Sequence, residues 1–341
     1  MKRLLIVILC VISICAAGVL LFGGTADEPS EPAPSVPVPL EEPPLAPFDE
    51  AVTLRVLTDG AVQELSLRDY LIGVLLAEMP TDFPAEALKA QVIASRTFAL
   101  RQAQAHKHDA ADICADPACC QGFIADAPTE ELARAEEAVT QTDGLVMLYE
   151  GALIDATFFS CSGGRTEAAV AVWGGDVPYL RSVESPGEED APRYEETVTL
   201  SAAEFAQTLC AAYPEANLAG EPKGWFGACS YTEGGGIETV FIGGTAVSGT
   251  QLRRLFSLRS TDITVSVTDE DEIMLTTRGF GHRVGLSQYG AKAMAESGKD
   301  FAAILTHYYT GANVTRLLVS EQPSDCRKSP ALAGLFLLYV V

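Results

Sequence analysis

A proline-rich segment near the N-terminus decides which part of this chain can fold. Eight prolines lie between Pro29 and Pro47, with glutamates scattered among them. Such a stretch cannot bury a hydrophobic core and tends towards extended polyproline geometry. We therefore predict a Pro/Glu-rich linker over residues 26–50, a folded domain over residues 51–320 and a C-terminal tail over residues 321–341.

An apolar run precedes this linker. Lys2 and Arg3 lead into Leu4–Phe22, which carries no charge and approaches the roughly 20 residues that a membrane-spanning helix needs. The basic pair predicts a cytoplasmic N-terminus and an exported body. We expect residues 1–25 to form a single-pass anchor, with the protein in the cell membrane and its folded domain extracytoplasmic. A cleaved signal peptide is the alternative, since Ala16–Gly18 offers small residues.

Composition limits the possible partners. The chain has 341 residues, of which 48% are hydrophobic, so it can bury one large core or two smaller ones. Its net charge is −23. Nucleic acid is excluded as a partner, because binding phosphates requires clustered lysines and arginines.

Helical and strand-like patterns are mixed along the folded part. Val52–Leu57 alternates as a half-buried strand does, and Leu65–Glu78 has helical spacing that Pro80 ends. Further helices are predicted from Pro84 to about Gln104 and at 200–213, 287–297 and 301–309, and further strands at 238–242 and 263–267. Without regular alternation, this pattern predicts an α+β fold, one body with a central groove behind the transmembrane helix and linker.

Glu78 is a candidate general acid. It closes the first predicted helix, where apolar neighbours and the negative end of the helix dipole both favour the protonated carboxyl. Cleavage of a glycosidic bond requires an acid that holds its proton near neutral pH. A solvated glutamate at a helix end is the alternative interpretation.

The next helix offers two cations. Lys89 and Arg96 are seven positions apart and therefore share a helix face. Opposite Glu78, they could bind acetamido or carboxylate groups; as an ordinary solvated stripe they would do nothing specific.

Small residues and aromatic residues supply further candidates. The stretch Phe158–Glu167 places a strand before serines and a glycine pair, and glycine lets a backbone approach a ligand closely. Trp173 and Tyr179 could stack on sugar rings. Ser160 and His282 suggest a Ser–His hydrolase as an alternative, although the chain has no Gly-x-Ser-x-Gly elbow.

Several of these segments together resemble one family, the stage II sporulation protein D family. The matching segments follow in the family's order across residues 50–315: Leu67–Val74, Ala77–Pro80, Phe83–Val92, Arg96–Leu100, Ser160–Glu167, Val172–Gly175, Val177–Leu180, Arg278–His282 and Ser287–Ala295. One position departs from the family pattern, where Arg283 replaces the usual glycine. We expect this cation to narrow the cleft or to bind anionic muramic acid.

The resemblance implies a lytic transglycosylase that remodels peptidoglycan during forespore engulfment. It implies cleavage between N-acetylmuramic acid and N-acetylglucosamine in denuded strands, 1,6-anhydro ends, and Glu78 as the essential acid/base. It also implies a partner amidase and a membrane partner. Candidate substrate contacts are Lys89, Arg96, Ser160, Ser162, Gly163, Gly164, Arg165, Trp173, His282, Gln288 and Tyr289. The alternative is a non-catalytic wall-binding module or amidase activator of the same fold.

A histidine and cysteine cluster follows the second helix. Thiolates and imidazoles within residues 106–120 suit tetrahedral zinc. The resemblance selects His108, Cys114, Cys119 and Cys120 as ligands of a structural Zn²⁺ that fixes a wall of the cleft. A disulfide is the alternative for an exported protein, and Cys210 and Cys229 could form a separate one.

Overall fold

The computed structural model describes residues 47–319 and 337–340. The predicted anchor and most of the predicted linker lie outside this range. Among the described residues, no helix is long and apolar enough to cross a bilayer. The predicted linker extends too far, because helix α1 (Phe48–Ala51) packs into the body with Phe48 only 2% exposed.

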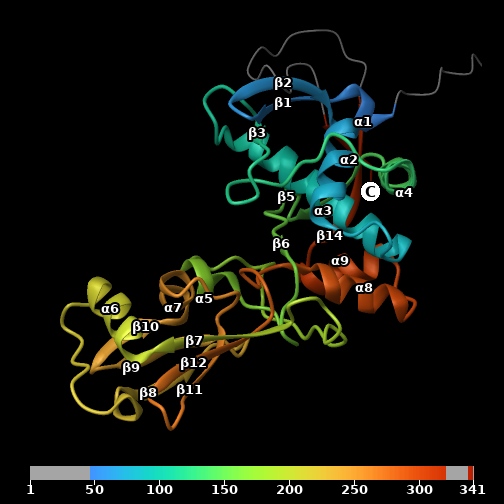
Figure 1. Ribbon diagram of the computed structural model, residues 1–341. Coiled ribbons are helices and arrows are strands. Elements are labelled where there is room, and N and C mark those ends of the chain that lie inside the picture. The colour runs from blue at the N-terminus through green and yellow to red at the C-terminus, as the bar shows by residue number, and fades with distance from the viewer. Residues whose placement is uncertain (1–46, 320–336, 341) are drawn as a thin grey trace, which may run out of the picture. The chain divides into compact units, whose positions relative to one another are not determined.

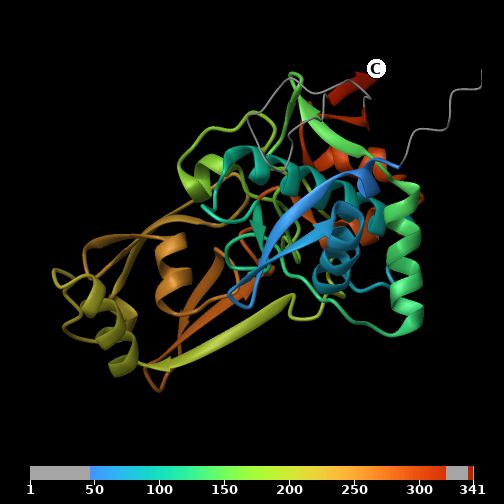
Figure 2. The same cartoon turned by 90° about the horizontal axis from the view of Figure 1, so that it is seen from above.

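Helices and a small sheet form the upper part of the body in Figure 1. Strands β1 (Thr53–Thr58) and β2 (Ala61–Ser66) pair in antiparallel fashion, and β3 (Ile113–Cys114) runs parallel to β1. Helices α2 (Leu67–Glu78), α3 (Ala85–Ala105) and α4 (Thr129–Gln141) pack against one another, and Figure 2 shows α4 along one side of the group.

Local signals fix both ends of α2. The Ser66 hydroxyl accepts a hydrogen bond from the Asp69 amide and caps the helix start. Met79, before Pro80, adopts extended geometry and ends the helix directly after Glu78. The candidate acid therefore sits at the helix C-terminus, as predicted.

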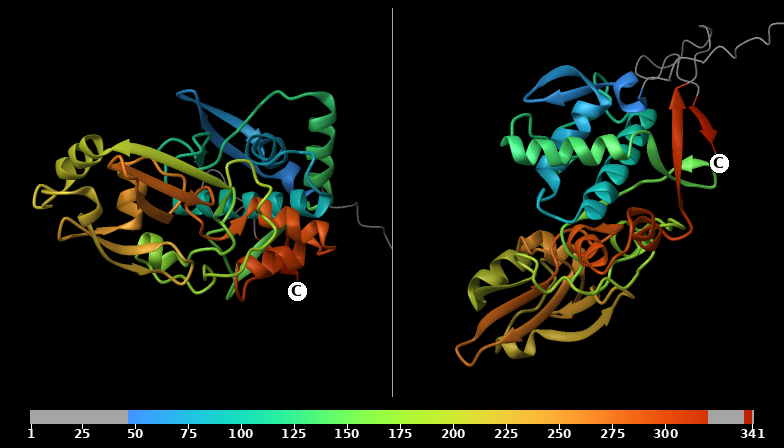
Figure 3. Two further views of the ribbon diagram at one scale, coloured as in Figure 1. Left: turned by 60° about the horizontal axis from the view of Figure 1, so that its bottom comes forward. Right: turned by 90° about the vertical axis from the view of Figure 1, so that its right-hand side faces the viewer.

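A second group of elements completes the first core. Strand β4 (Leu145–Tyr149) pairs with β5 (Ala152–Leu153) and β14 (Asn313–Val319), and β14 pairs with β15 (Leu337–Val340). The predicted C-terminal tail thus contributes a strand, visible beside the helices in Figure 3. Helices α8 (Gln288–Glu296) and α9 (Phe301–Tyr308) pack on α3, and β6 (Phe158–Phe159) runs parallel to β13 (Leu286–Ser287).

The middle of the chain builds a second hydrophobic core, at the lower left of Figure 1. One sheet contains β7 (Glu195–Ser201), β12 (Glu272–Arg278) and β11 (Asp262–Val267), and another contains β8 (Phe226–Tyr231), β9 (Ile237–Ile242) and β10 (Thr245–Ser248). Helices α6 (Ala202–Ala212) and α7 (Gly249–Leu255) cover them, and a short 3₁₀ turn lies at Pro222–Gly224.

The α+β class is confirmed, and the described residues contain two hydrophobic cores. The separate disulfide is wrong: Cys210 and Cys229 are both free thiols. Cys229 is exposed on the edge strand β8, whereas the Cys210 thiol bonds the Ala216 carbonyl.

Candidate active site

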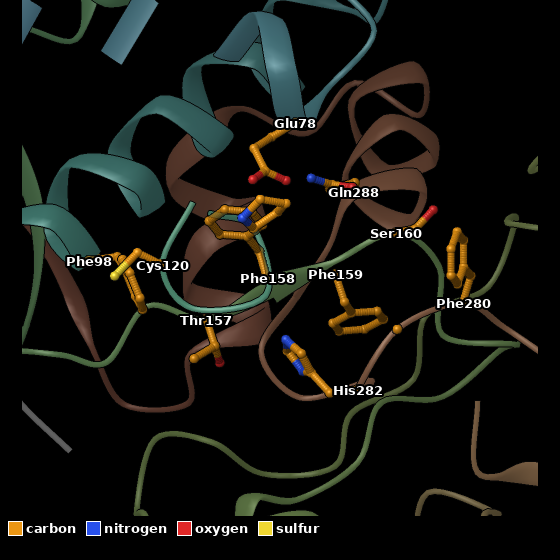
Figure 4. A pocket seen from close by; sticks show the side chains of 12 residues that line it. Glu78, Phe98, Cys120, Thr157, Phe158, Phe159, Ser160, Phe280, His282 and Gln288 are labelled. Atoms are coloured by element: carbon orange, nitrogen blue, oxygen red, sulfur yellow. The ribbon is translucent and has the colours of Figure 1, made fainter. Parts of the chain in front are cut away.

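Glu78 lines a cavity of about 350 Å³ that six stretches of the chain enclose. Figure 4 shows its carboxyl entering this space from the end of α2, above a floor of aromatic rings. The other lining residues are Phe98, Pro117, Cys120, Thr157, Phe158, Phe159, Ser160, Phe280, Gly281, His282 and Gln288. Glu78 is the one carboxyl among these lining residues.

Two opposing effects act on the Glu78 carboxyl. Burial raises its pKa, and a hydrogen bond from the Gly122 amide opposes this in part. The net direction is upward, which favours the protonated acid near neutral pH. The alternative of a freely solvated helix-end glutamate is therefore wrong.

The Gly122 amide makes the two oxygens of the Glu78 carboxyl inequivalent, because it bonds only one of them. Its amide donates to Oε1 at 2.6 Å. When Glu78 is protonated, the oxygen that accepts this bond is best suited to be the carbonyl oxygen, which leaves Oε2 to carry the proton. A Cβ at position 122 would lie 3.1 Å from Oε1 and 3.2 Å from the Ala77 Cβ, so the close approach requires glycine. The sequence offered no local signal for this residue.

His282 forms part of the cavity wall. Its ring packs against Phe159 and Trp173 with centroid separations of 5.6 and 5.3 Å, and its Nδ1 accepts the Val284 amide at 3.1 Å. Burial, and secondarily the charge of Arg253, lowers its pKa to about 4, so the ring is neutral at physiological pH. Figure 4 shows the Ser160 hydroxyl directed away from His282, which contradicts the Ser–His hydrolase alternative.

The two predicted cations do not line the cavity. Arg96 is fully buried, with Nε 2.8 Å from the Asp49 carboxylate and Nη1 3.0 Å from the Leu145 carbonyl. It cannot contact a glycan, so this prediction is wrong; the missing information was its partner Asp49, in the predicted linker. Lys89 forms an ion pair with Glu86 at 2.8 Å and is mostly buried.

Ser160 lines the cavity, whereas the serine and the two glycines that follow Cys161 form hydrogen bonds elsewhere. Ser162 is fully buried, and its amide and hydroxyl donate to Glu188 Oε2 at 2.6 and 2.8 Å. Gly163 donates to the same oxygen at 3.1 Å. Ser162 as a substrate contact is therefore wrong, and Glu188 is a structural residue that the sequence analysis missed.

Four further candidates lie outside the cavity lining. Arg165 pairs with Glu233 at 2.9 Å, and Gly164 donates to the Ser162 hydroxyl at 3.0 Å. Tyr289 packs edge-on against Phe83 with ring centroids 5.1 Å apart. Trp173 is half exposed and stacks beside His282, so it remains a candidate surface for a sugar ring at the cavity edge.

Arg283 does not face the cleft, contrary to expectation. It is 1% exposed, and its guanidinium bonds the Ser162 carbonyl at 2.6 Å, the Gly234 carbonyl at 2.7 Å and Glu167 at 3.3 Å. Gly234 lies in the turn between β8 and β9. Arg283 therefore joins the cavity loop to the second core and binds no anionic sugar.

The predicted His/Cys quartet is confirmed as a cluster that could hold a metal ion. One ligand atom from each of His108, Cys114, Cys119 and Cys120 lies within 4.8 Å of the others. His108 Nε2 is 3.3 Å from the Cys120 sulfur, and the Cys119 and Cys120 sulfurs are 4.0 Å apart. Tetrahedral zinc separates such atoms by about 3.5–3.8 Å. The three cysteines are free thiols, so a disulfide here is wrong.

The comparisons with known proteins place the chain in a class of sporulation proteins. Residues 58–149 match the family model described as "Stage II sporulation protein". The chain belongs to the stage II sporulation protein D family. It is 35% identical to stage II sporulation protein D of Bacillus amyloliquefaciens, over 80% of this chain and 81% of that protein. It is 36% identical to the Bacillus subtilis (strain 168) protein, over 75% and 76%.

A more distant relative has a different name. The chain is 28% identical to the amidase enhancer of Bacillus subtilis (strain 168), over 72% of this chain and 40% of that protein. A sequence similar to most of this chain thus occurs in a protein named as an amidase enhancer.

Proposed function

We propose that this protein is a peptidoglycan lytic transglycosylase that cleaves between N-acetylmuramic acid and N-acetylglucosamine in denuded strands. The observation that carries the proposal is a single, partly buried carboxyl, Glu78, in a cavity lined in large part by aromatic rings. Ordinary glycoside hydrolases use two carboxyl groups, the second serving as nucleophile or activating water. A lytic transglycosylase replaces that water with the sugar's own 6-hydroxyl and needs one acid/base.

Glu78 serves both halves of this reaction. In the first half, its Oε2 proton moves to the glycosidic oxygen, and the C1–O bond breaks with its electron pair leaving on that oxygen. In the second half, the 6-hydroxyl oxygen of the muramic acid bonds to C1 and its proton returns to Glu78. The carboxyl is regenerated, no water is consumed, and the product is a 1,6-anhydro end.

The His/Cys cluster would support this acid structurally. His108, Cys114, Cys119 and Cys120 would hold Zn²⁺, and four protein ligands leave no open position for a water. Gly122, two residues after Cys120, holds Glu78 Oε1. A bound ion would therefore fix the loop that orients the acid.

The proposed setting is the septal wall during engulfment. The predicted anchor would hold the domain outside the membrane, beside a wall amidase and a membrane partner. The amidase enhancer relative supports an amidase as neighbour and favours one rival function, a non-catalytic amidase activator.

The test compares the wild-type protein, Glu78→Gln and the exposed control Glu130→Gln on denuded glycan strands, with products identified by mass spectrometry. We expect anhydro ends from the wild type and the control, and at least about a 100-fold loss for Glu78→Gln, as for loss of an essential proton donor. Retained activity in Glu78→Gln would place the acid elsewhere. Amidase stimulation without any new chain ends would establish the rival function.

A further inference from the structure

Gln288 faces Glu78 across the cavity with an unused hydrogen-bond donor. It is the first residue of α8, is 7% exposed and lines the cavity. Its Nε2 is buried and has no hydrogen-bond partner among the described residues. Figure 4 shows the amide nitrogen directed at the Glu78 carboxyl.

An unpaired buried donor is costly, because its hydrogen bond to water is lost and not replaced. The neutral form of Glu78 does not need this donor, since Oε1 already accepts the Gly122 amide and Oε2 carries the proton. Once the acid has transferred its proton, Oε2 becomes an anionic acceptor in a cavity whose lining includes four phenylalanines. The unused donor is complementary to this later state.

The protein fixes the backbone that presents Gln288. The preceding Ser287 hydroxyl donates to Glu188 Oε1 at 2.6 Å and accepts the Gly290 amide at 3.2 Å as the helix cap. The following Tyr289 amide bonds the Ser160 carbonyl at 3.0 Å. A Cβ at position 290 would lie 2.0 Å from the Tyr308 hydroxyl, so Gly290 allows this tight packing. The start of α8 is thus held from three sides before substrate arrives.

We propose that Gln288 donates its Nε2–H to Oε2 of Glu78 after the acid has released its proton, and so stabilises the carboxylate between the two halves of the reaction. This inference rests on the proposed transglycosylase function. The proton goes to the leaving glycosidic oxygen, and the hydrogen bond from Gln288 forms as negative charge develops on Oε2. When the proton of the 6-hydroxyl returns to Oε2, that hydrogen bond is released. In the carboxylate state, Gly122 donates a hydrogen bond to Oε1 and Gln288 donates one to Oε2 of Glu78.

The test uses two substitutions of similar size in the full chain. Gln288→Met removes the donor, and Gln288→Glu replaces only the amide NH₂ with oxygen. A hydrogen bond to a charged group predicts a fall in kcat of about 10- to 100-fold for Gln288→Met, with KM changed by less than about twofold. Lys292→Gln on the same helix lies outside the cavity lining and serves as the matched control.

A second readout separates donation from mere packing. The introduced carboxyl of Gln288→Glu can donate an O–H only while protonated, so its activity relative to Gln288→Met should rise as the pH is lowered. A structural role predicts a constant ratio. If Gln288→Met does not fold, as judged by its thermal transition, the pH dependence of Gln288→Glu relative to wild type decides the question by the same criterion.

Two results would overturn the inference: a kcat for Gln288→Met within about twofold of wild type, or an unchanged kcat with a raised KM, which would make Gln288 a substrate contact. Failure of the underlying function looks different, because the wild-type protein itself would then release no anhydro ends. An active wild type, an inactive Glu78→Gln and an unimpaired Gln288→Met would reject this inference alone.

Discussion

The raised pKa of Glu78 lowers the stability of the folded protein at neutral pH. A buried carboxyl with a raised pKa retains its proton at a pH where the unfolded chain has lost it. The native state then binds more protons than the unfolded state, so the free energy of unfolding falls as pH rises through this window. This pH range begins near the ordinary glutamate pKa of about 4.3 and ends above the raised pKa that Glu78 has in the native state.

Because the free energy of unfolding falls as Glu78 ionises, we predict that Glu78→Gln stabilises the protein at pH 7 while it abolishes the proposed catalysis. Glutamine keeps an oxygen for the Gly122 amide and never ionises, so we expect a gain of about 0.5–2 kcal/mol, the usual range for a stabilising substitution. At pH 3, where both side chains are neutral, the gain should vanish. Denaturant unfolding at the two pH values measures the difference. A variant less stable than wild type at pH 7 and equally stable at pH 3 would show that ionised Glu78 is favourably bound.

Individual residues were predictable from sequence only where their signals are local. Glu78 follows from a helix ended by Pro80, and its apolar neighbours adjoin it in the chain. Gly122 and Glu188 could not be found, because their partners are distant: Gly122 bonds a residue 44 positions away, and Glu188 bonds Ser287, 99 positions away. Arg96 was misassigned because helical spacing gives its face but not the buried carboxylate that meets it.

At the scale of elements, the predicted bounds lie close to the observed ones for helices that begin at a capping residue or end before a proline. Ser201 caps α6 with a reciprocal bond to Glu204, and Ser287 caps α8. Strand β2 was not predicted separately from the helix that follows it, because it is largely exposed and lacks an apolar alternation. Helix α4 was also missed: it buries only Ala135, Ala138 and Val139, which leave a weak apolar pattern.

The loop between α3 and α4 carries a prediction about metal. We expect purified protein to contain about one zinc ion per chain, because one imidazole nitrogen and three thiol sulfurs already lie within 4.8 Å of one another. Removing it with a chelator, or substituting Cys114→Ser, should lower both Tm and activity, since the loop that holds Glu78 loses its fixed point. Elemental analysis and thermal unfolding provide the measurements. Cys229→Ser, an exposed free thiol, is the control, and a zinc-free protein with full activity and unchanged Tm would refute the role.

At the scale of the whole folded body, two hydrophobic cores must be joined without closing the cavity. Arg283 provides one junction, because it bonds the cavity loop at Ser162 and the β8–β9 turn at Gly234. Glu167 completes it, pairing with Arg283 and accepting the Thr232 hydroxyl at 2.7 Å and the Gly236 amide at 3.1 Å. Sequence alone identified Arg283 as unusual but suggested the wrong surroundings, since nothing local shows that it points inward.

A buried ion pair of this kind predicts a particular pattern of mutational energies. Arg283→Met should destabilise the protein by about 3–5 kcal/mol, because it leaves the Glu167 carboxylate buried without its cation. Adding Glu167→Gln should recover part of that loss, since the uncharged amide costs less to bury and can still accept from Thr232 and Gly236. A double-mutant cycle by denaturant unfolding measures the coupling, with the exposed pair Arg278 and Glu195 as control, where about 0–1 kcal/mol is expected. Additive effects at Arg283 and Glu167 would mean that the guanidinium joins the two cores through its carbonyl contacts alone, and that the charge of Glu167 contributes nothing to the junction.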